Sequence, residues 1–346
     1  MSSESLPHWS ANHLYYHGDR DLPLRQAVLD ATRRWVAEGW VDSWFFVRLS
    51  LGGHHLRIRR RVVAGVDPAL PEALLRSVCE DFFGRQPSTD TIEAERIREH
   101  NAYVRRFDPT ETDDTVYPDN SLQNAAFVPE TERYGGPGLV DASFDYFCLS
   151  SLQVMHVLDT GPEPLGGRRL SLAFALLVRQ VWGFAAAENE VMDLIAYPPS
   201  VEAVEAKADA AYERRPATYL ALLKRELLQI VEDPHSATDP VPLVAGARCL
   251  REAIGSLPAA KQLHLRRSQL HMTSNRLGLE NREETYLARL VIRAVKDLRK
   301  IDEEFWSRCV DLLSMPAAGA DLPTLRSAAL ASSLEPVVSG SSRSVP

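Results

Sequence analysis

Residues 43–61 read SWFFVRLSLGGHHLRIRRR, and this stretch decides the fold that we expect for the first part of the chain. Two runs with strand-like composition flank Gly52 and Gly53. Strand-like runs joined by a glycine-bearing turn are typical of a β-hairpin. The stretch therefore predicts two paired antiparallel strands near the amino terminus.

Side chains alternate between the two faces of a strand, which assigns each residue of the second run to a face. Leu56 and Ile58 are expected to point toward a core. The opposite face should then carry a polar row: His55, Arg57, Arg59 and Arg61. Such a row is either the wetted face of an edge strand or an anion site, because guanidinium groups bind carboxylates and phosphates bidentately. The first strand adds Arg48, on the same face as Trp44 and Phe46.

The segments around the hairpin predict mixed strand and helix. The expected elements are a short aromatic strand at 13–17, helices at 24–36, 69–84 and 90–106, an acidic loop at 108–120 and a strand at 122–128. These assignments follow from hydrophobic periodicity and turn residues. They predict an α+β region over residues 1–136.

After the Gly135-Gly136-Pro137-Gly138 break, nearly every segment up to residue 315 has helical periodicity. The expected helices include 139–158, 167–185, 200–231 and 282–313, the last with Asn281 as a candidate cap and Glu284 three residues later. The chain thus divides into an α+β region at 1–136 and an α-helical region at 137–315, forming one interlocked unit or two. Residues 316–346 are expected to be a flexible tail.

Composition excludes several classes of protein. The 346 residues are 45% hydrophobic and 25% charged, which are ordinary globular values. A formal charge of −8 argues against direct binding to nucleic acid. The cysteines are far apart and indicate buried apolar residues in a reducing compartment. No apolar run is long enough to span a bilayer, so we expect a cytoplasmic protein.

Two further stretches concentrate polar side chains. In PETERYGGPG, residues 129–138, Glu130 and Arg133 form either an ordinary ion pair or part of an anion site. In HMTSNRLG, residues 271–278, an unusual density of polar groups precedes the helix expected from 282. His271 is either a structural histidine or a group that transfers protons near neutral pH. Asn275 and Arg276 could alternatively cap a helix.

Common cofactor and hydrolase motifs are absent from the sequence. Metal ligation through GGHHLR at 52–57 is weakly indicated, because adjacent histidines on a strand point to opposite faces. We therefore expect neither a metal nor a cofactor.

Taken in order, WFFVRLSLGGHHLRIR, ETERYGG and HMTSNRLG resemble the carboxy-terminal elimination domain of class I lantibiotic dehydratases. The same family includes stand-alone proteins of thiopeptide biosynthesis, both split elimination subunits and pyridine synthases. The resemblance runs from the strand near Tyr15 through the helix after Gly278. Members of this family process ribosomally made precursor peptides.

The resemblance implies four catalytic residues: Arg59, Glu130, Arg133 and His271. Arg57 is the alternative to Arg59 on the strand. The expected substrate-binding residues are Trp44, Arg48, Arg57, Tyr134, Ser274, Asn275 and Arg276. The implied reaction expels glutamate from a glutamylated serine or threonine and leaves a dehydroamino acid.

Such an elimination has clear chemical needs. Removing the α-proton builds enolate charge, and the departing group is a carboxylate, so positive donors are wanted at both places. Arg59 and Arg133 meet that demand. His271 suits the proton transfer, with Glu130 orienting an arginine or the histidine.

The length of the chain leaves no room for a glutamylating domain. The resemblance then implies a separate tRNA-dependent glutamylating subunit as a partner, and a homodimer is left open. The main rival is a pyridine synthase, which joins two dehydroalanines in a formal [4+2] cycloaddition and releases the leader peptide. The presence of all four residues that the resemblance assigns to glutamate elimination favours elimination over pyridine formation. A scaffold that only binds the precursor peptide would need the hairpin and helices but not His271.

Overall fold

A four-stranded antiparallel sheet forms the first part of the structure, a computed structural model that describes residues 8–106, 115–235, 238–317 and 319–334. Its strands, in spatial order, are β2 (Val41–Leu49), β3 (His55–Val62), β1 (His8–Tyr15) and β4 (Ser121–Ala125). The predicted hairpin is confirmed, because β2 and β3 pair antiparallel. Gly52 and Gly53 have φ angles of 72° and 121°, which explains why the turn contains glycine.

The boundaries of the outer strands differ from the prediction. The strand expected at 13–17 starts five residues earlier, at His8, and the strand expected at 122–128 ends at Ala125. Of the acidic loop expected at 108–120, residues 108–114 lie outside the described residues. These differences leave the α+β class of the chain unchanged.

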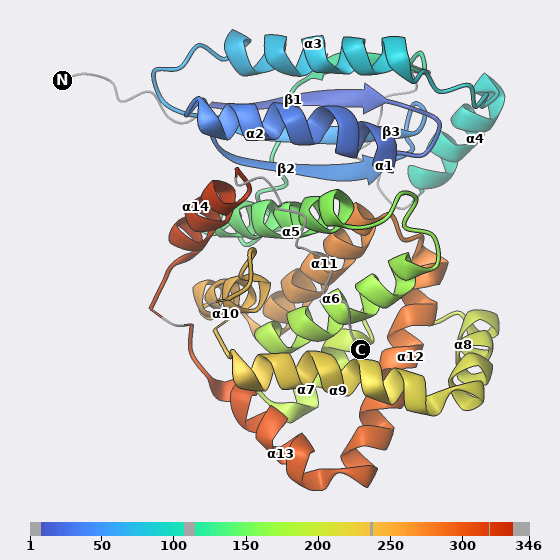
Figure 1. Cartoon of the computed structure of the whole chain (residues 1–346), viewed down its shortest axis with the longest axis vertical. Coiled ribbons are helices and arrows are strands. Elements are labelled where there is room, and N and C mark those ends of the chain that lie inside the picture. The colour runs from blue at the N-terminus through green and yellow to red at the C-terminus, as the bar shows by residue number, and fades with distance from the viewer. Residues whose placement is uncertain (1–7, 107–114, 236–237, 318, 335–346) are drawn as a thin grey trace, which may run out of the picture.

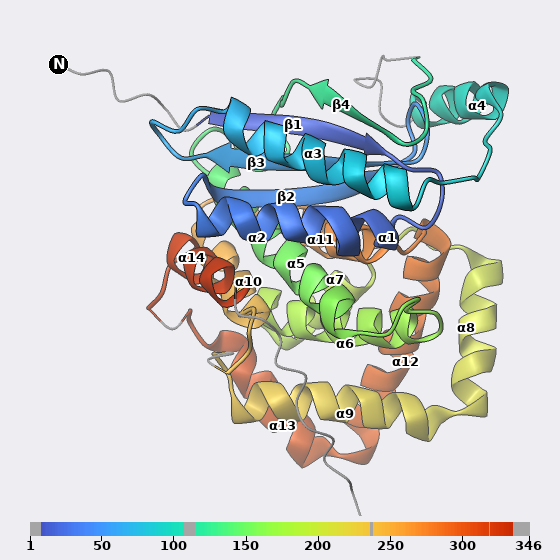
Figure 2. The same cartoon turned by 45° about the horizontal axis from the view of Figure 1, so that its top comes forward.

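The helices of the first part pack on the sheet. They are the continuous helical segment α1 (Asp21–Pro23), η1 (Leu24–Val28) and α2 (Leu29–Ala37), followed by α3 (Ala69–Arg85) and α4 (Ala94–Val104). Helices α2 and α3 lie over one face of the sheet (Figure 2). Leu56 and Ile58 are fully buried, as the alternation of side chains predicts.

The register of the hairpin separates the arginines into two groups. Arg59 lies opposite Phe45, and Arg57 lies opposite Val47. Arg48 lies opposite Leu56, so it points to the other face of the sheet. The sequence interpretation that added Arg48 to the arginine row is therefore wrong. Trp44 lies opposite Arg60, on the same face as Arg48, so it does not lie beside that row either.

The second part is built from helices, which pack beneath the edge strand β2 (Figure 1). They are α5 (Val140–Thr160), α6 (Arg168–Phe184), α7 (Glu188–Ile195), α8 (Glu202–Arg214), α9 (Pro216–Glu232), α10 (Leu243–Ala253), α11 (Ala259–Leu277), α12 (Asn281–Ile301), α13 (Glu303–Asp311), η2 (Leu312–Ser314) and α14 (Leu322–Ser332). The structure thus has the predicted α+β front and mainly helical back.

Several predicted helices have different limits. The helix expected at 200–231 is divided in two before Pro216, and the one expected at 282–313 is divided at Asp302, whose side chain caps α13. The N-cap of α12 is Glu280 with a capping box to Glu283, instead of Asn281. Residues 322–332, expected in a flexible tail, form α14 and pack on α5. Arg326 of α14 makes a buried ion pair with Asp145 of α5, which fixes that helix in place.

The stretch HMTSNRLG is the end of α11 and not a connector. Gly278, the last residue of the stretch, is the C-cap of α11 in the left-handed conformation with φ 87°, and its N–H donates to the carbonyl of Asn275. Glycine at this position ends a helix without a steric penalty. The polar residues of this stretch therefore project from a helix, at three- and four-residue intervals.

One contiguous cluster of buried apolar side chains includes residues of both parts of the chain. The division at residue 136 remains a prediction. All four cysteines are buried and free, as expected. Among the described residues, none of the helices combines the length and apolarity needed to cross a membrane.

Candidate active site

The outer face of β3 presents Arg57 and Arg59 beside aromatic rings. The guanidinium of Arg59 lies 5.7 Å from the centre of the Phe45 ring and 5.3 Å from that of Phe127. Arg61, the next residue of the row, is ion-paired with Asp42 at 2.7 Å. In the predicted arginine row, Arg61 is thus paired with Asp42, and Arg59 lies against two aromatic rings.

Histidine and tyrosine rings stack at the turn end of the same face. His55 lies 5.0 Å from His13 and 4.7 Å from Tyr15, measured between ring centres. Burial lowers the pKa of His55 well below its ordinary value, so the ring is neutral at pH 7. The described residues contain no cluster of three or more histidine, cysteine, aspartate or glutamate side chains suited to a metal ion.

Glu130, Arg133 and Tyr134 lie in the turn that precedes α5. Arg133 donates to the Glu130 carboxylate at 2.8 Å, and both side chains are exposed. The Arg133 guanidinium also lies 5.7 Å from the centre of the Tyr134 ring. Tyr134 is buried, its hydroxyl lies 3.5 Å from Ser268 Oγ on α11, and burial raises its pKa. This turn is thereby anchored to α11.

Arg276 joins the turn to the sheet. Its Nε donates to the Phe46 carbonyl at 2.8 Å, and its Nη1 donates to Ser150 Oγ at 3.0 Å. The guanidinium lies 4.5 Å from the centre of the Phe147 ring, whose edge also meets Tyr134. The side chain is fully buried, and burial lowers the pKa of Arg276 to about 9.

A network of aromatic rings therefore links the three sequence stretches. The Phe45 ring lies between Arg59 and Arg276, 5.7 and 6.0 Å from their guanidinium carbons. Arg59 is also close enough to Arg276 to contribute to lowering the pKa of Arg276. Residues from β3, the turn before α5 and α11 thus converge, although they are distant in the sequence.

His271 lies on α11 between two points of contact with the rest of this region. Ser268, three residues earlier, meets Tyr134, and Asn275, four residues later, bonds to the backbone of β2. Residues at these spacings share a helix face. His271 Nδ1 lies 3.0 Å from a carboxylate oxygen of Glu284 on α12. Beside them, Tyr197 and Ser274 hydroxyls are 3.0 Å apart.

Asn275 and Arg48 have structural contacts that the sequence did not indicate. The Asn275 side chain accepts from the Arg48 N–H and donates to the Arg48 carbonyl, both at 2.9 Å. The Arg48 guanidinium is buried and ion-paired with Asp21 at 2.6 Å. Arg48 and Trp44 lie apart from the arginine and aromatic network, and we do not carry them into the proposed site.

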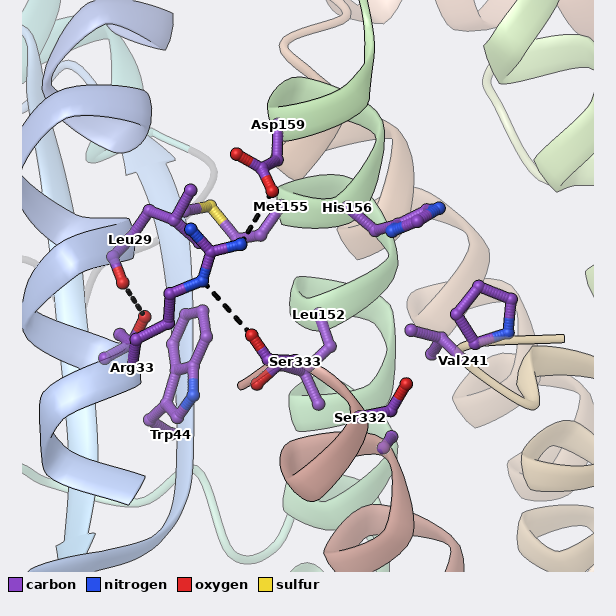
Figure 3. A pocket seen from close by; sticks show the side chains of 13 residues that line it. Leu29, Arg33, Trp44, Leu152, Met155, His156, Asp159, Val241, Ser332 and Ser333 are labelled. Atoms are coloured by element: carbon purple, nitrogen blue, oxygen red, sulfur yellow. Dashed lines mark hydrogen bonds and ion pairs between the residues drawn. The ribbon is translucent and has the colours of Figure 1, made fainter. Parts of the chain in front are cut away.

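Two cavities in the described part of the chain are lined by none of Arg59, Arg133 and His271. Figure 3 shows one of about 340 Å³ between α2, α5 and α14, with Trp44 at its wall and the Arg33–Asp159 ion pair at one side. The other, of about 700 Å³, lies near Asn275 and the start of α12. Its lining includes the basic side chains of Arg20, His54, Arg96 and His100.

Sequence reasoning missed Glu284 and the rings that support the arginines. Glu284 is thirteen residues from His271, and only the packing of α11 on α12 brings the two together. Phe45 could have been found, because strand alternation places it on the face opposite to Trp44 and Phe46. Phe147 could not, since α5 is apolar on nearly all sides.

Comparison with known proteins identifies relatives of this fold. The family model described as "Lantibiotic biosynthesis dehydratase C-term" matches residues 9–295. No match was found among curated proteins.

Three solved structures are similar. The pyridine synthase TbtD from thiomuracin biosynthesis is 16% identical with a TM-score of 0.61, covering 85% of this chain and 99% of TbtD. TsrL is 15% identical with a TM-score of 0.57, covering 89% of this chain and 98% of TsrL. The tRNA-dependent lantibiotic dehydratase MibB from Microbispora sp. 107891 is 22% identical with a TM-score of 0.52, covering 84% of this chain but 28% of MibB. These likenesses show a shared fold.

Proposed function

This chain belongs to the family of lantibiotic biosynthesis dehydratase carboxy-terminal domains, and from that premise we propose that it eliminates glutamate from glutamylated serine or threonine in a precursor peptide. The product is a dehydroalanine or dehydrobutyrine residue. The observation that carries the proposal is the convergence of Arg59, Arg276 and Tyr134 around the rings of Phe45 and Phe147. Esterification of the hydroxyl is assigned to a separate glutamylating subunit.

The elimination breaks the Cα–H and Cβ–O bonds and forms an N–H bond on His271 and the Cα–Cβ π bond. His271 takes the α-proton, the electron pair forms the Cα–Cβ double bond, and the Cβ–O bond breaks to release the glutamyl carboxylate. Charge develops on the carbonyl oxygen of the modified residue and on the departing carboxylate. Arg59 and Arg133 are assigned to those two oxygen centres, because charge-assisted donors fixed before reaction stabilise developing negative charge.

Glu130 holds Arg133 by an ion pair of 2.8 Å, so we assign Glu130 to orienting that arginine. Arg276 is fully buried and lacks a carboxylate partner among the described residues. The Phe45 ring separates it from Arg59, so we assign Arg276 to holding the rings against which Arg59 lies. Ser274 and Tyr134 are buried, and their hydroxyls lie against Tyr197 and Ser268, so we assign them to supporting the site instead of to contacts with the peptide.

The test uses a synthetic precursor peptide that carries an O-glutamyl serine. Incubation with the protein is expected to produce a peptide that has lost glutamate, measured by mass spectrometry. Arg59→Gln should slow the loss about 100-fold, as for removal of one oxyanion donor. Arg61→Gln is the matched control on the same strand face, and its rate should stay near that of the natural chain because Asp42 already neutralises Arg61. An unchanged peptide mass with correctly folded protein would reject elimination.

Pyridine formation is the second candidate, favoured by one observation. The likeness to TbtD extends over 99% of that protein, whereas MibB is covered over only 28%. The same assay separates the candidates when a peptide with two dehydroalanines replaces the glutamylated one. Formation of a macrocycle with release of the leader segment supports this second activity, and the glutamylated peptide should then remain intact.

A scaffold without catalysis is tested by the same variants. His271→Ala and Arg133→Ala should abolish turnover while peptide binding persists if the protein is an enzyme. Binding without turnover in the natural chain would instead support the scaffold.

A further inference from the structure

A buried carboxylate faces the histidine that the proposed reaction uses. Glu284 Oε1 and Oε2 lie 3.1 and 3.0 Å from His271 Nδ1. The Glu284 side chain is 2% exposed, whereas His271 is 38% exposed. One nitrogen of the imidazole is therefore directed toward the protein, and the ring itself reaches solvent.

The contact determines which nitrogen can act as a base. A carboxylate accepts hydrogen bonds and cannot donate one when ionised, so Nδ1 must carry the proton in this pair. Nε2 of the neutral ring then has the lone pair. A carboxylate that orients a histidine in this way also stabilises the imidazolium formed when the ring takes a proton.

A tyrosine hydroxyl also bonds to the carboxylate. Tyr197 lies between α7 and α8, and its hydroxyl is 3.0 Å from Ser274 Oγ. Burial, together with the nearby Glu284 charge, raises the pKa of Tyr197 well above its ordinary value. The phenol thus stays neutral and can donate a hydrogen bond. Tyr197, between α7 and α8, and His271, on α11, thus both bond to Glu284, which restricts the rotation of its side chain.

We propose that Glu284 is the positioning residue of His271, holding the ring with Nδ1 protonated and Nε2 directed at the substrate α-proton. The inference rests on the proposed function, because it assumes that His271 transfers the proton. Tyr197, whose hydroxyl also meets Ser274, keeps the carboxylate in the orientation that accepts from Nδ1.

The first test reads the tautomer and does not depend on activity. Nitrogen-15 NMR of the full chain is expected to show a protonated Nδ1 and an unprotonated Nε2 for the neutral His271 ring. Glu284→Gln should shift the ring toward the form protonated on Nε2, because the neutral amide no longer favours one tautomer. Asp297→Asn is the matched control, since Asp297 lies on the same helix but bonds to Tyr212. An unchanged His271 tautomer in Glu284→Gln would overturn the inference.

The second test is kinetic. Glu284→Gln should lower kcat for glutamate loss about 10- to 100-fold with little change in KM, as expected for the partner of an acting histidine. Glu284→Asp keeps the charge and should give an intermediate kcat. If Glu284→Gln does not fold, the test uses Glu284→Asp. A kcat of Glu284→Asp equal to that of the natural chain would contradict the inference.

Different results would reject the role of His271 in the proposed function and the role of Glu284. Full activity of His271→Ala would reject the proton-transfer role of His271, and the inference would fall with it, whatever the tautomer. Loss of activity in His271→Ala together with natural kcat in Glu284→Gln would reject only the role of Glu284.

Discussion

Buried arginines in this fold fall into two kinds, distinguished by whether a carboxylate meets them. Arg48 is ion-paired with Asp21 at 2.6 Å. Arg60 is fully buried between the sheet and α2, with its guanidinium 5.3 Å from the centre of the Trp35 ring, and donates to Asn12. Its Nε and Nη2 lack hydrogen-bond partners among the residues that the structure describes. Burial lowers the pKa of Arg60 to about 10. A buried charge without a counter-ion costs free energy of folding.

The same substitution at these two positions should have opposite consequences. Arg60→Met should keep the free energy of unfolding within about 1 kcal/mol or raise it, because a flexible apolar chain replaces an unpaired charge. Arg48→Met should lower it by about 3 kcal/mol, since it leaves Asp21 with one cation fewer. Urea unfolding at pH 7 measures both. A loss in Arg60→Met as large as that in Arg48→Met would show that Arg60 is stabilised by contacts other than those described.

Single residues on the hairpin could be placed from the sequence because strand geometry is local. Alternation put Leu56 and Ile58 in the core and Arg57 and Arg59 on the other face. Contacts between distant segments could not be placed in this way. The Glu284–His271 pair depends on how two helices pack, and no local pattern specifies that packing.

The free edge of β2 explains much of the polarity of HMTSNRLG. An edge strand exposes unpaired N–H and C=O groups. Here Ser151 accepts from the Phe46 N–H, Arg276 donates to the Phe46 carbonyl, and Asn275 bonds to both backbone groups of Arg48. Side chains of α5 and α11 thereby take the place of a neighbouring strand.

Asn275→Ala should test this edge contact. It removes one acceptor and one donor at once, and leaves the Arg48 N–H and carbonyl partly buried without partners. We expect a loss of about 2 kcal/mol in the free energy of unfolding, from the cost of unsatisfied backbone groups. Asn281→Ala is the control, because Asn281 is exposed and should change stability by less than about 0.5 kcal/mol. Equal effects of the two variants, measured by urea unfolding, would contradict this role.

Element boundaries were missed for two reasons: a local signal was overlooked, or tertiary contacts decide the boundary. The break before Pro216 had a local signal, since proline starts α9. Serine, threonine and asparagine favour helices weakly, so HMTSNRLG did not suggest the end of α11. Helix α14 has local start signals, Asp321 as N-cap and Pro323 in its first turn, that the expectation of a flexible tail overlooked. Its packing against α5 and the Arg326–Asp145 pair are tertiary contacts that the sequence does not show.

The sheet and the helical part are joined by a charged cluster as well as by the apolar core. Asp21 of α1 accepts from Arg48 of β2 at 2.6 Å and from Arg169 of α6 at 2.8 Å. Arg169 also donates to the Leu277 carbonyl at the end of α11. These contacts connect α1, β2, α6 and α11. Asp21 supplies the one carboxylate that takes part in them.

Acid should weaken this connection. Burial alone would raise the pKa of Asp21, but the guanidinium groups of Arg48 and Arg169 outweigh it and hold the pKa below its ordinary value. Because the pKa is lower in the folded state, the ionised carboxylate contributes stability that is fully present above about pH 4 and is lost as pH falls further.

Asp21→Asn should therefore lower the free energy of unfolding by about 3 kcal/mol at pH 7, with a difference from the natural chain that shrinks below pH 4. Urea unfolding between pH 3 and pH 7 measures that difference. Asp42→Asn is the control, because the Arg61–Asp42 pair is partly exposed and should contribute less than about 1 kcal/mol. A difference for Asp21→Asn that stays constant down to pH 3 would mean that the carboxylate charge does not stabilise the junction, and that α6 and α11 are held to the sheet by the apolar core alone.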